Sequence, residues 1–96
     1  MKPSEALNLH RAAIRGIVDA HRGRNVRVFG SVAMGADTEG SDLDILIDPT
    51  PATTLLDIGA IRHELHKLLG ISVDVLTPKA LPDKFREAVL AQAIPV

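Results

Sequence analysis

Two runs of alternating apolar residues on either side of a helical stripe constrain the fold of this 96-residue chain more than any other feature. Residues 43–47 and 71–75 each place an apolar side chain at every second position, which is typical of a strand with one buried face. Between them, apolar residues from Ile58 to Leu69 recur at helical spacing, and Gly70 is a helix stop. Strand, helix and strand in this order predict two parallel strands joined by a right-handed crossover.

The rest of the chain adds two helices, one strand and a loop in the order α-β-β-α-β-α. We expect an α/β fold in a single domain spanning 1–96, with a small mixed β-sheet of about three strands flanked by helices; the first two strands can be antiparallel neighbours. The first predicted elements are a helix from Glu5 to about Arg22 capped by Ser4, a strand at 26–29, and a loop at 30–41 with one helical turn near Val32–Met34. Thr53 or Thr54 caps the second helix, and a last helix begins at Pro82. An apolar tail at 94–96 docks on the domain or on a partner.

The composition excludes several classes of protein. There is no cysteine, so neither a disulfide framework nor a thiolate zinc site is available. A net charge of −1 and the absence of Trp and Tyr argue against nucleic acid as the main partner. The only aromatic residues, Phe29 and Phe85, lie in apolar periodic settings that indicate core positions. No secretory leader precedes the first helix and no apolar run reaches the ~20 residues of a membrane span, so we expect a cytoplasmic protein.

Three aspartates are the candidate chemical groups. Asp42 and Asp44 lie two apart at the start of the second strand, so they share one face about 6.6 Å apart along the chain. Asp74 is the single acid of the third strand. The topology can bring all three carboxylates to one end of the sheet, where they would suit one or two hard cations. Such a set is typical of two-metal phosphoryl transfer.

Gly30 and Ser31 supply the second half of this site. A glycine lets the backbone approach a phosphate closely, and backbone N–H groups with the Ser31 hydroxyl can donate to its oxygens. No Lys or Arg occurs from Val28 to Ile61, so a triphosphate bound here would depend on a divalent metal for neutralisation. The remaining cations that could reach the site from elsewhere are Arg24, Arg27, Arg62 and Lys79.

Plainer interpretations exist for each of these groups. The aspartate pair can be a solvated strand start, and Asp74 a surface residue of an edge strand. Residues 37–41 superficially resemble a calcium loop, but the glycine position and the closing Glu are wrong. His63 and His66 lack a zinc motif and are most simply helix-surface residues.

The spacing between the Gly-Ser turn and the aspartate pair resembles the motif of a known family. Gly30-Ser31, ten further residues and Asp42-Leu43-Asp44 are similar to the motif of the polymerase-β-type nucleotidyltransferase superfamily. The short chain, the Phe-Gly-Ser entry and the Val-Asp-Val-Leu-Thr-Pro run at 73–78 resemble its minimal nucleotidyltransferases, the MNT or MntA-like group. The resemblance implies the polymerase-β-like nucleotidyltransferase fold. It also implies metal binding by Asp42, Asp44 and Asp74, a catalytic role for all three, and nucleotide binding by Gly30 and Ser31.

The same resemblance implies a reaction and a partner. It implies two Mg²⁺ ions, ATP as substrate, and transfer of AMP to a hydroxyl, typically a tyrosine, of a HEPN-domain toxin that the protein neutralises as an antitoxin. The chain departs from the common pattern at Met34, where many relatives carry an arginine. This departure keeps open an alternative in which a weak or inactive antitoxin neutralises its partner by binding alone. A small-molecule nucleotidyltransferase is a third alternative.

Overall fold

A computed structural model describes all 96 residues and shows a four-stranded mixed sheet in the order β3-β2-β1-β4. The strands are β1 (Gly23–Phe29), β2 (Leu43–Pro49), β3 (Val73–Leu76) and β4 (Ile94–Pro95). β2 and β3 are parallel, whereas β1 is antiparallel to both β2 and β4. The predicted parallel crossover and the antiparallel first pair are therefore confirmed. The sheet has one strand more than the sequence suggested.

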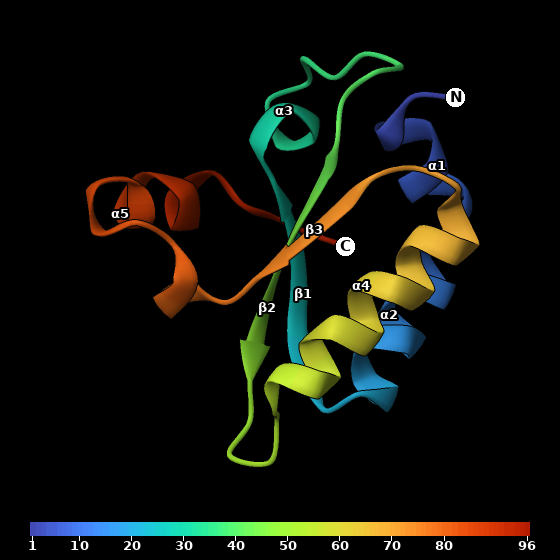
Figure 1. Ribbon diagram of the computed structural model, residues 1–96. Coiled ribbons are helices and arrows are strands. Elements are labelled where there is room, and N and C mark those ends of the chain that lie inside the picture. The colour runs from blue at the N-terminus through green and yellow to red at the C-terminus, as the bar shows by residue number, and fades with distance from the viewer.

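Helices flank this sheet on two sides (Figure 1). α1, α2 and α4 lie on one side of it and α5 lies on the other, with α3 and the loop that follows it at one end. No helix has both the length and the apolar character that a membrane crossing requires. The helical elements are α1 (Pro3–Leu9), α2 (Arg11–Ala20), α3 (Gly30–Ala33), α4 (Leu55–Leu69), the short 3₁₀ helix η1 (Pro78–Ala80) and α5 (Asp83–Gln92).

The hydrophobic core lies between the sheet and the side that carries α2 and α4. β2 contributes most to it, because its apolar residues alternate along the strand and it has a neighbour on each edge. Leu46, on the opposite face of β2, is also fully buried. The core cluster consists of Leu7, Ile14, Val18, Val26, Val28, Leu43, Ile45, Ile47, Ile61, Leu65, Val73 and Val75.

The predicted single helix from Glu5 to Arg22 is wrong, because the chain leaves helical geometry at His10. His10 has φ −126° and ψ 22°, and it separates α1 from α2. Leu7 of α1 and Ile14 of α2 lie in the same core on either side of this break. Apolar periodicity continues across the break, so the sequence pattern did not reveal it.

The start of β1 also differs from the prediction, whereas the apolar tail takes one of its two expected places. β1 begins at Gly23, earlier than expected, and its register against β2 shifts between Arg24 and Arg27. Asn25, with φ 52°, lies inside this irregular stretch. The apolar tail docks on the domain as β4, and the Val96 N–H donates to the Val26 carbonyl at 3.1 Å.

The core assignment of the two phenylalanines is only partly right. Phe29 is half-buried at the end of β1, but Phe85 on α5 is 56% exposed. No residue of α5 is buried. The helix is held to the preceding turn by Arg86, whose guanidinium donates to the carbonyls of Pro78, Lys79 and Leu81. The helical periodicity of α5 therefore does not mark a core face.

The predicted ends of α4 are confirmed. Thr54 is the N-cap: its side chain accepts from the Asp57 N–H, and the Asp57 carboxylate accepts from the Thr54 N–H in return. Gly70 ends the helix with φ 68° in the left-handed region. These two ends fix the length of the crossover and so the register of β3 beside β2.

Candidate active site

Asp44 and Asp74 lie side by side on neighbouring parallel strands. The register pairs Asp44 of β2 with Asp74 of β3, and on the other side it pairs Asp44 with Phe29 of β1. Strand neighbours in register share a face about 4.8 Å apart. Ile45 and Val75, the next residues of each strand, are buried in the core. The two aspartates therefore face away from α2 and α4, as the sequence predicted.

Asp42 precedes β2 by one residue and completes the acidic set. It lies two residues before Asp44, which puts it on the same side of the chain where the extended backbone begins. Asp42 and Asp74 are exposed and Asp44 is half-buried. Burial raises the pKa of the Asp44 carboxyl, and the neighbouring charges of Asp74 and Asp42 raise that pKa further. The charges of Asp42 and Asp74 are thus close enough to Asp44 to disfavour its ionisation.

No basic side chain offsets this charge. None of the ion pairs in the protein involves Asp42, Asp44 or Asp74. As the side chains stand, no group of three acidic or histidine residues is gathered closely enough to hold a metal ion. The donor set itself fits a hard divalent cation, because it consists of carboxylate oxygens and carries uncompensated negative charge. Asp42, Asp44 and Asp74 are the residues that could hold such an ion.

Gly30 lies directly against the Asp44 carboxylate. Its φ of +70° is a left-handed conformation that L side chains rarely adopt, and a Cβ placed on it would lie 2.2 Å from Asp44 Oδ2. Ser31 follows as a half-buried residue of α3, a helix of four residues that packs on β1 and β2. The structure thus brings Gly30 and Ser31 to the same end of the sheet as the acids. Their phosphate-binding role stays a prediction.

Two of the four cations that could have reached the site are already paired. Arg24 binds Asp19 at 2.9 Å, and Arg27 binds Asp48 on the side of the sheet that carries Asp44. Met34, at the C-terminal end of α3, is 61% exposed and adds no charge. Arg24, Arg27 and Met34 therefore offer no free positive charge to a triphosphate at the acidic end of the sheet.

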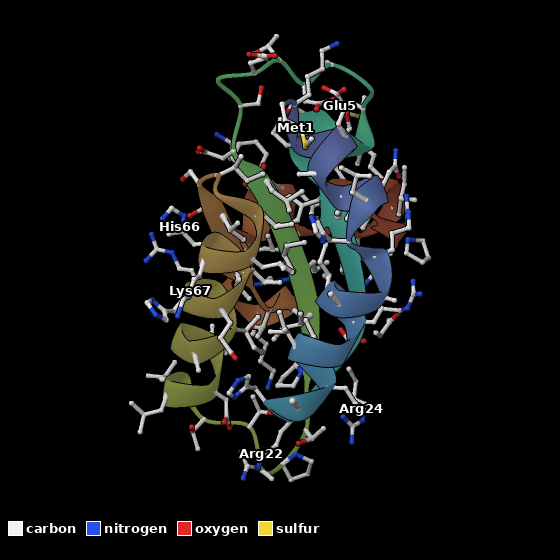
Figure 2. All side chains as sticks on the ribbon, turned by 90° about the vertical axis from the view of Figure 1, so that its right-hand side faces the viewer. Met1, Glu5, Arg22, Arg24, His66 and Lys67 are labelled. Carbon is white, nitrogen blue, oxygen red and sulfur yellow. The ribbon has the colours of Figure 1, made fainter.

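A tether that sequence reasoning missed holds the loop leading to Asp42. The Asp37 carboxylate accepts a hydrogen bond from the Ser4 N–H at 2.9 Å, across 33 residues of sequence. This bond, at the N-terminus of α1, lowers the pKa of Asp37. The Met1 amino group lies 3.6 Å from Glu39 in the same loop. Figure 2 shows Met1 at the end of the molecule where this loop lies. Because Asp37 lies 33 residues from Ser4 in the sequence, no local sequence pattern indicates this hydrogen bond, and only the structure reveals it.

Carboxylates beside a glycine turn, at the end of a small mixed sheet, are typical of enzymes that transfer phosphoryl or nucleotidyl groups. Residues 11–96 match the family model described as a nucleotidyltransferase domain. The chain therefore belongs to the nucleotidyltransferase domain family, and the resemblance noted in the sequence is confirmed.

Two archaeal relatives agree with this assignment. A Methanocaldococcus jannaschii protein provisionally named protein adenylyltransferase MJ0435 is 34% identical over 76 residues, which cover 79% of this chain and 82% of the relative. The protein adenylyltransferase MntA of Thermococcus cleftensis is 34% identical over 71 residues, covering 74% of this chain and 72% of the relative. The chain is accordingly a nucleotidyltransferase whose relatives are named protein adenylyltransferases.

Solved structures show the same fold. One described as a provisional minimal nucleotidyltransferase matches with a TM-score of 0.86 and 41% identity, covering 97% of this chain and 95% of the other. A toxin–antitoxin complex solved with AMP-PNP matches with a TM-score of 0.73 and 17% identity, covering 88% of this chain and 69% of the other. The polymerase-β-like fold expected from the resemblance is confirmed.

Proposed function

We propose that this single-domain protein transfers AMP from ATP to a tyrosine hydroxyl of a HEPN-type toxin in the cytoplasm, and thereby acts as an antitoxin. The observation that carries the proposal is the acidic set of Asp42, Asp44 and Asp74, which faces one side of the sheet without a basic partner. Two further findings support it. Relatives are named protein adenylyltransferases, and a protein of the same fold occurs in a toxin–antitoxin complex with an ATP analogue.

In this mechanism the three aspartates have distinct roles. Asp42, Asp44 and Asp74 would hold Mg²⁺, and Asp74 accepts the proton of the acceptor hydroxyl. Bound Mg²⁺ supplies charge neutralisation for the triphosphate and the developing pyrophosphate. The hydroxyl oxygen forms a bond to the α-phosphorus while the bond to the bridging oxygen breaks and pyrophosphate leaves. The pKa of Asp44 is raised in the metal-free protein, and a bound cation would offset the repulsion that contributes to this shift.

Gly30 and Ser31 orient the nucleotide. Because Gly30 carries no side chain, its left-handed turn lies directly against the Asp44 carboxylate and brings the N–H groups that follow it to the acidic set. The Ser31 hydroxyl and neighbouring N–H groups donate to the terminal phosphate oxygens. No step requires a second domain if the acceptor is supplied by another protein.

Calorimetry tests the site before any acceptor is known. ATP is titrated into the purified protein with and without Mg²⁺, and wild type is compared with the Asp42→Asn/Asp44→Asn variant. The proposal expects metal-dependent binding that the variant loses. Transfer is then measured with α-labelled ATP and a co-purified partner, in which substitution of the acceptor tyrosine by phenylalanine abolishes labelling. No ATP binding at millimolar concentration, with or without the partner, would contradict the proposal.

The alternative is an antitoxin that neutralises by contact alone. One observation favours it: Arg24 and Arg27 are paired elsewhere and Met34 carries no charge, so triphosphate binding has little support beyond the metal. The Asp42→Asn/Asp44→Asn variant separates the two functions. If it still forms the complex and still neutralises the toxin, contact is sufficient. If it forms the complex and fails to neutralise, transfer is required.

A further inference from the structure

A groove beside α4 and β3 contains none of the residues of the acidic set. It lies between α4 and the start of β3 and has a volume of about 340 Å³. We call it the α4–β3 groove. Three of its residues are basic or can become so, and none is acidic. Its lining consists of Gly59, Arg62, His63, His66, Ser72 and Val73.

The polar groups of this groove have unused donors. The Nε–H of Arg62 donates to the Val73 carbonyl at 3.1 Å, and the two terminal amino groups of Arg62 have no partner in the structure. His66 Nδ1 donates to the Ile71 carbonyl at 2.7 Å, which leaves Nε2 free. His66 projects outward from α4, beside Lys67 (Figure 2). Arg62 is permanently charged, and each histidine adds a second donor when it is protonated.

The neighbouring acids do not compete for these donors. Glu64, on the same helix, is paired with His21 of α2. Asp74 lies on β3 with its side chain toward the opposite side of the sheet from α4. The groove is therefore a patch of positive character with no internal counter-charge. An anionic group is the chemistry that would complement it.

The position of the groove links it to the acidic site. β3 is an edge strand, and Figure 1 shows it in front of β2 and β1 with no element covering its outer edge. Ser72 lies two residues before Asp74, about 6.6 Å along the chain. A polypeptide that approached Asp74 from this edge would pass the groove.

We propose that the α4–β3 groove binds an acidic segment of the protein acceptor and so holds the acceptor beside Asp74. The identity of that occupant rests on the proposed function, since only a protein acceptor has such a segment. Side-chain donors spread over one turn of α4, from Arg62 to His66, suit carboxylates along a peptide. A free phosphate is usually held by successive backbone N–H groups, which this groove does not present.

The test uses the full chain in buffer without metal or ATP. The probes are the capped peptide Glu-Glu-Tyr-Glu-Glu, its Gln-for-Glu counterpart, and inorganic phosphate, each followed through the amide NMR signals of Gly59, Ser72 and Val73. Arg62→Ala removes the fixed charge. His63→Glu introduces a negative charge at an exposed position, and Lys84→Glu on α5 introduces a negative charge at an exposed position outside the groove.

The expected result is a saturable shift with the acidic peptide and none with the Gln peptide. Arg62→Ala and His63→Glu should weaken the apparent affinity at least about tenfold, whereas Lys84→Glu leaves it unchanged. Absence of a saturable shift, or equal affinity in His63→Glu, overturns the proposal. If inorganic phosphate binds and the acidic peptide does not, an acidic segment is not the occupant of the groove. Because the assay contains no nucleotide, its failure is distinct from failure of the transfer activity.

Discussion

The carboxylate of Asp44 occupies the space that a side chain on Gly30 would need. A Cβ at position 30 would lie 2.2 Å from Asp44 Oδ2, and the φ of +70° already disfavours any residue but glycine. The turn after β1 and the acid of β2 are therefore fitted to each other, because the antiparallel register sets Phe29 beside Asp44. Gly30, in the first half of the sequence motif, therefore helps to position Asp44 in its second half.

Gly30→Ala tests this fit. The left-handed strain costs about 1–2 kcal/mol of stability, and the clash displaces the Asp44 carboxylate. A shift of about 1 Å in a catalytic group can lower the rate about 100-fold, so we expect a loss of that order in AMP transfer. Gly35→Ala is the matched control: φ is +69°, but a Cβ there would meet nothing within 4 Å. Similar loss of transfer in both variants would show that strain alone is responsible.

Removal of the aspartate pair should change how Mg²⁺ affects stability. With Mg²⁺ at about 100 times its Kd, wild type should gain about 2.7 kcal/mol in the free energy of unfolding, and Asp42→Asn/Asp44→Asn should gain none. Thermal unfolding with and without MgCl₂ measures this. The double variant Asp19→Asn/Glu87→Gln removes two carboxylates elsewhere and should keep the wild-type response. A stabilisation by Mg²⁺ that survives in Asp42→Asn/Asp44→Asn would contradict the metal site.

In the metal-free protein, ionisation of Asp44 should lower the free energy of unfolding as the pH rises. Because the pKa of Asp44 is raised in the folded state, its ionisation costs stability as pH rises from the unfolded pKa through the folded one. Asp44→Asn removes that cost, so the metal-free variant should be at least as stable as wild type at pH 7. Urea unfolding at pH 4 and pH 7 gives the comparison. A variant that is less stable than wild type at pH 7 would show that Asp44 has a stabilising partner.

Much of the fold followed from the sequence because local pattern and topology agree. The alternation around Asp44 and Asp74, with a capped helix between them, determined two parallel strands and put both acids on one face. The break at His10 and the exposure of Phe85 did not follow, because apolar periodicity does not reveal a single non-helical residue or a helix without a core face. The Gly30–Asp44 contact and the Asp37–Ser4 bond depend on side-chain positions across the fold, and no local pattern encodes them.

The tether from Asp37 to α1 should control the order of the loop before Asp42. Asp37→Ala removes the acceptor for the Ser4 N–H, so the amides of residues 35–41 should exchange with solvent roughly tenfold faster. Hydrogen exchange measured by NMR reports this directly. Asp37→Asn keeps a side-chain oxygen at the same place and should preserve most of the protection. Glu39→Gln should have little effect, since its partner lies at 3.6 Å and both groups are exposed.

The capping box of α4 should give the protein part of its acid sensitivity. The Thr54 N–H, and after it the Arg22 charge, lower the pKa of the Asp57 carboxyl. A depressed folded pKa adds stability that is fully present above the unfolded pKa, near 3.9, and is lost as pH falls through the folded value. Wild type should therefore lose more stability than Asp57→Asn between pH 5 and about pH 2, as measured by urea midpoints. At pH 7, Thr54→Ala should cost about 1 kcal/mol, because it leaves the Asp57 N–H without its acceptor. Equal acid sensitivity of wild type and Asp57→Asn would show that other carboxylates dominate this window.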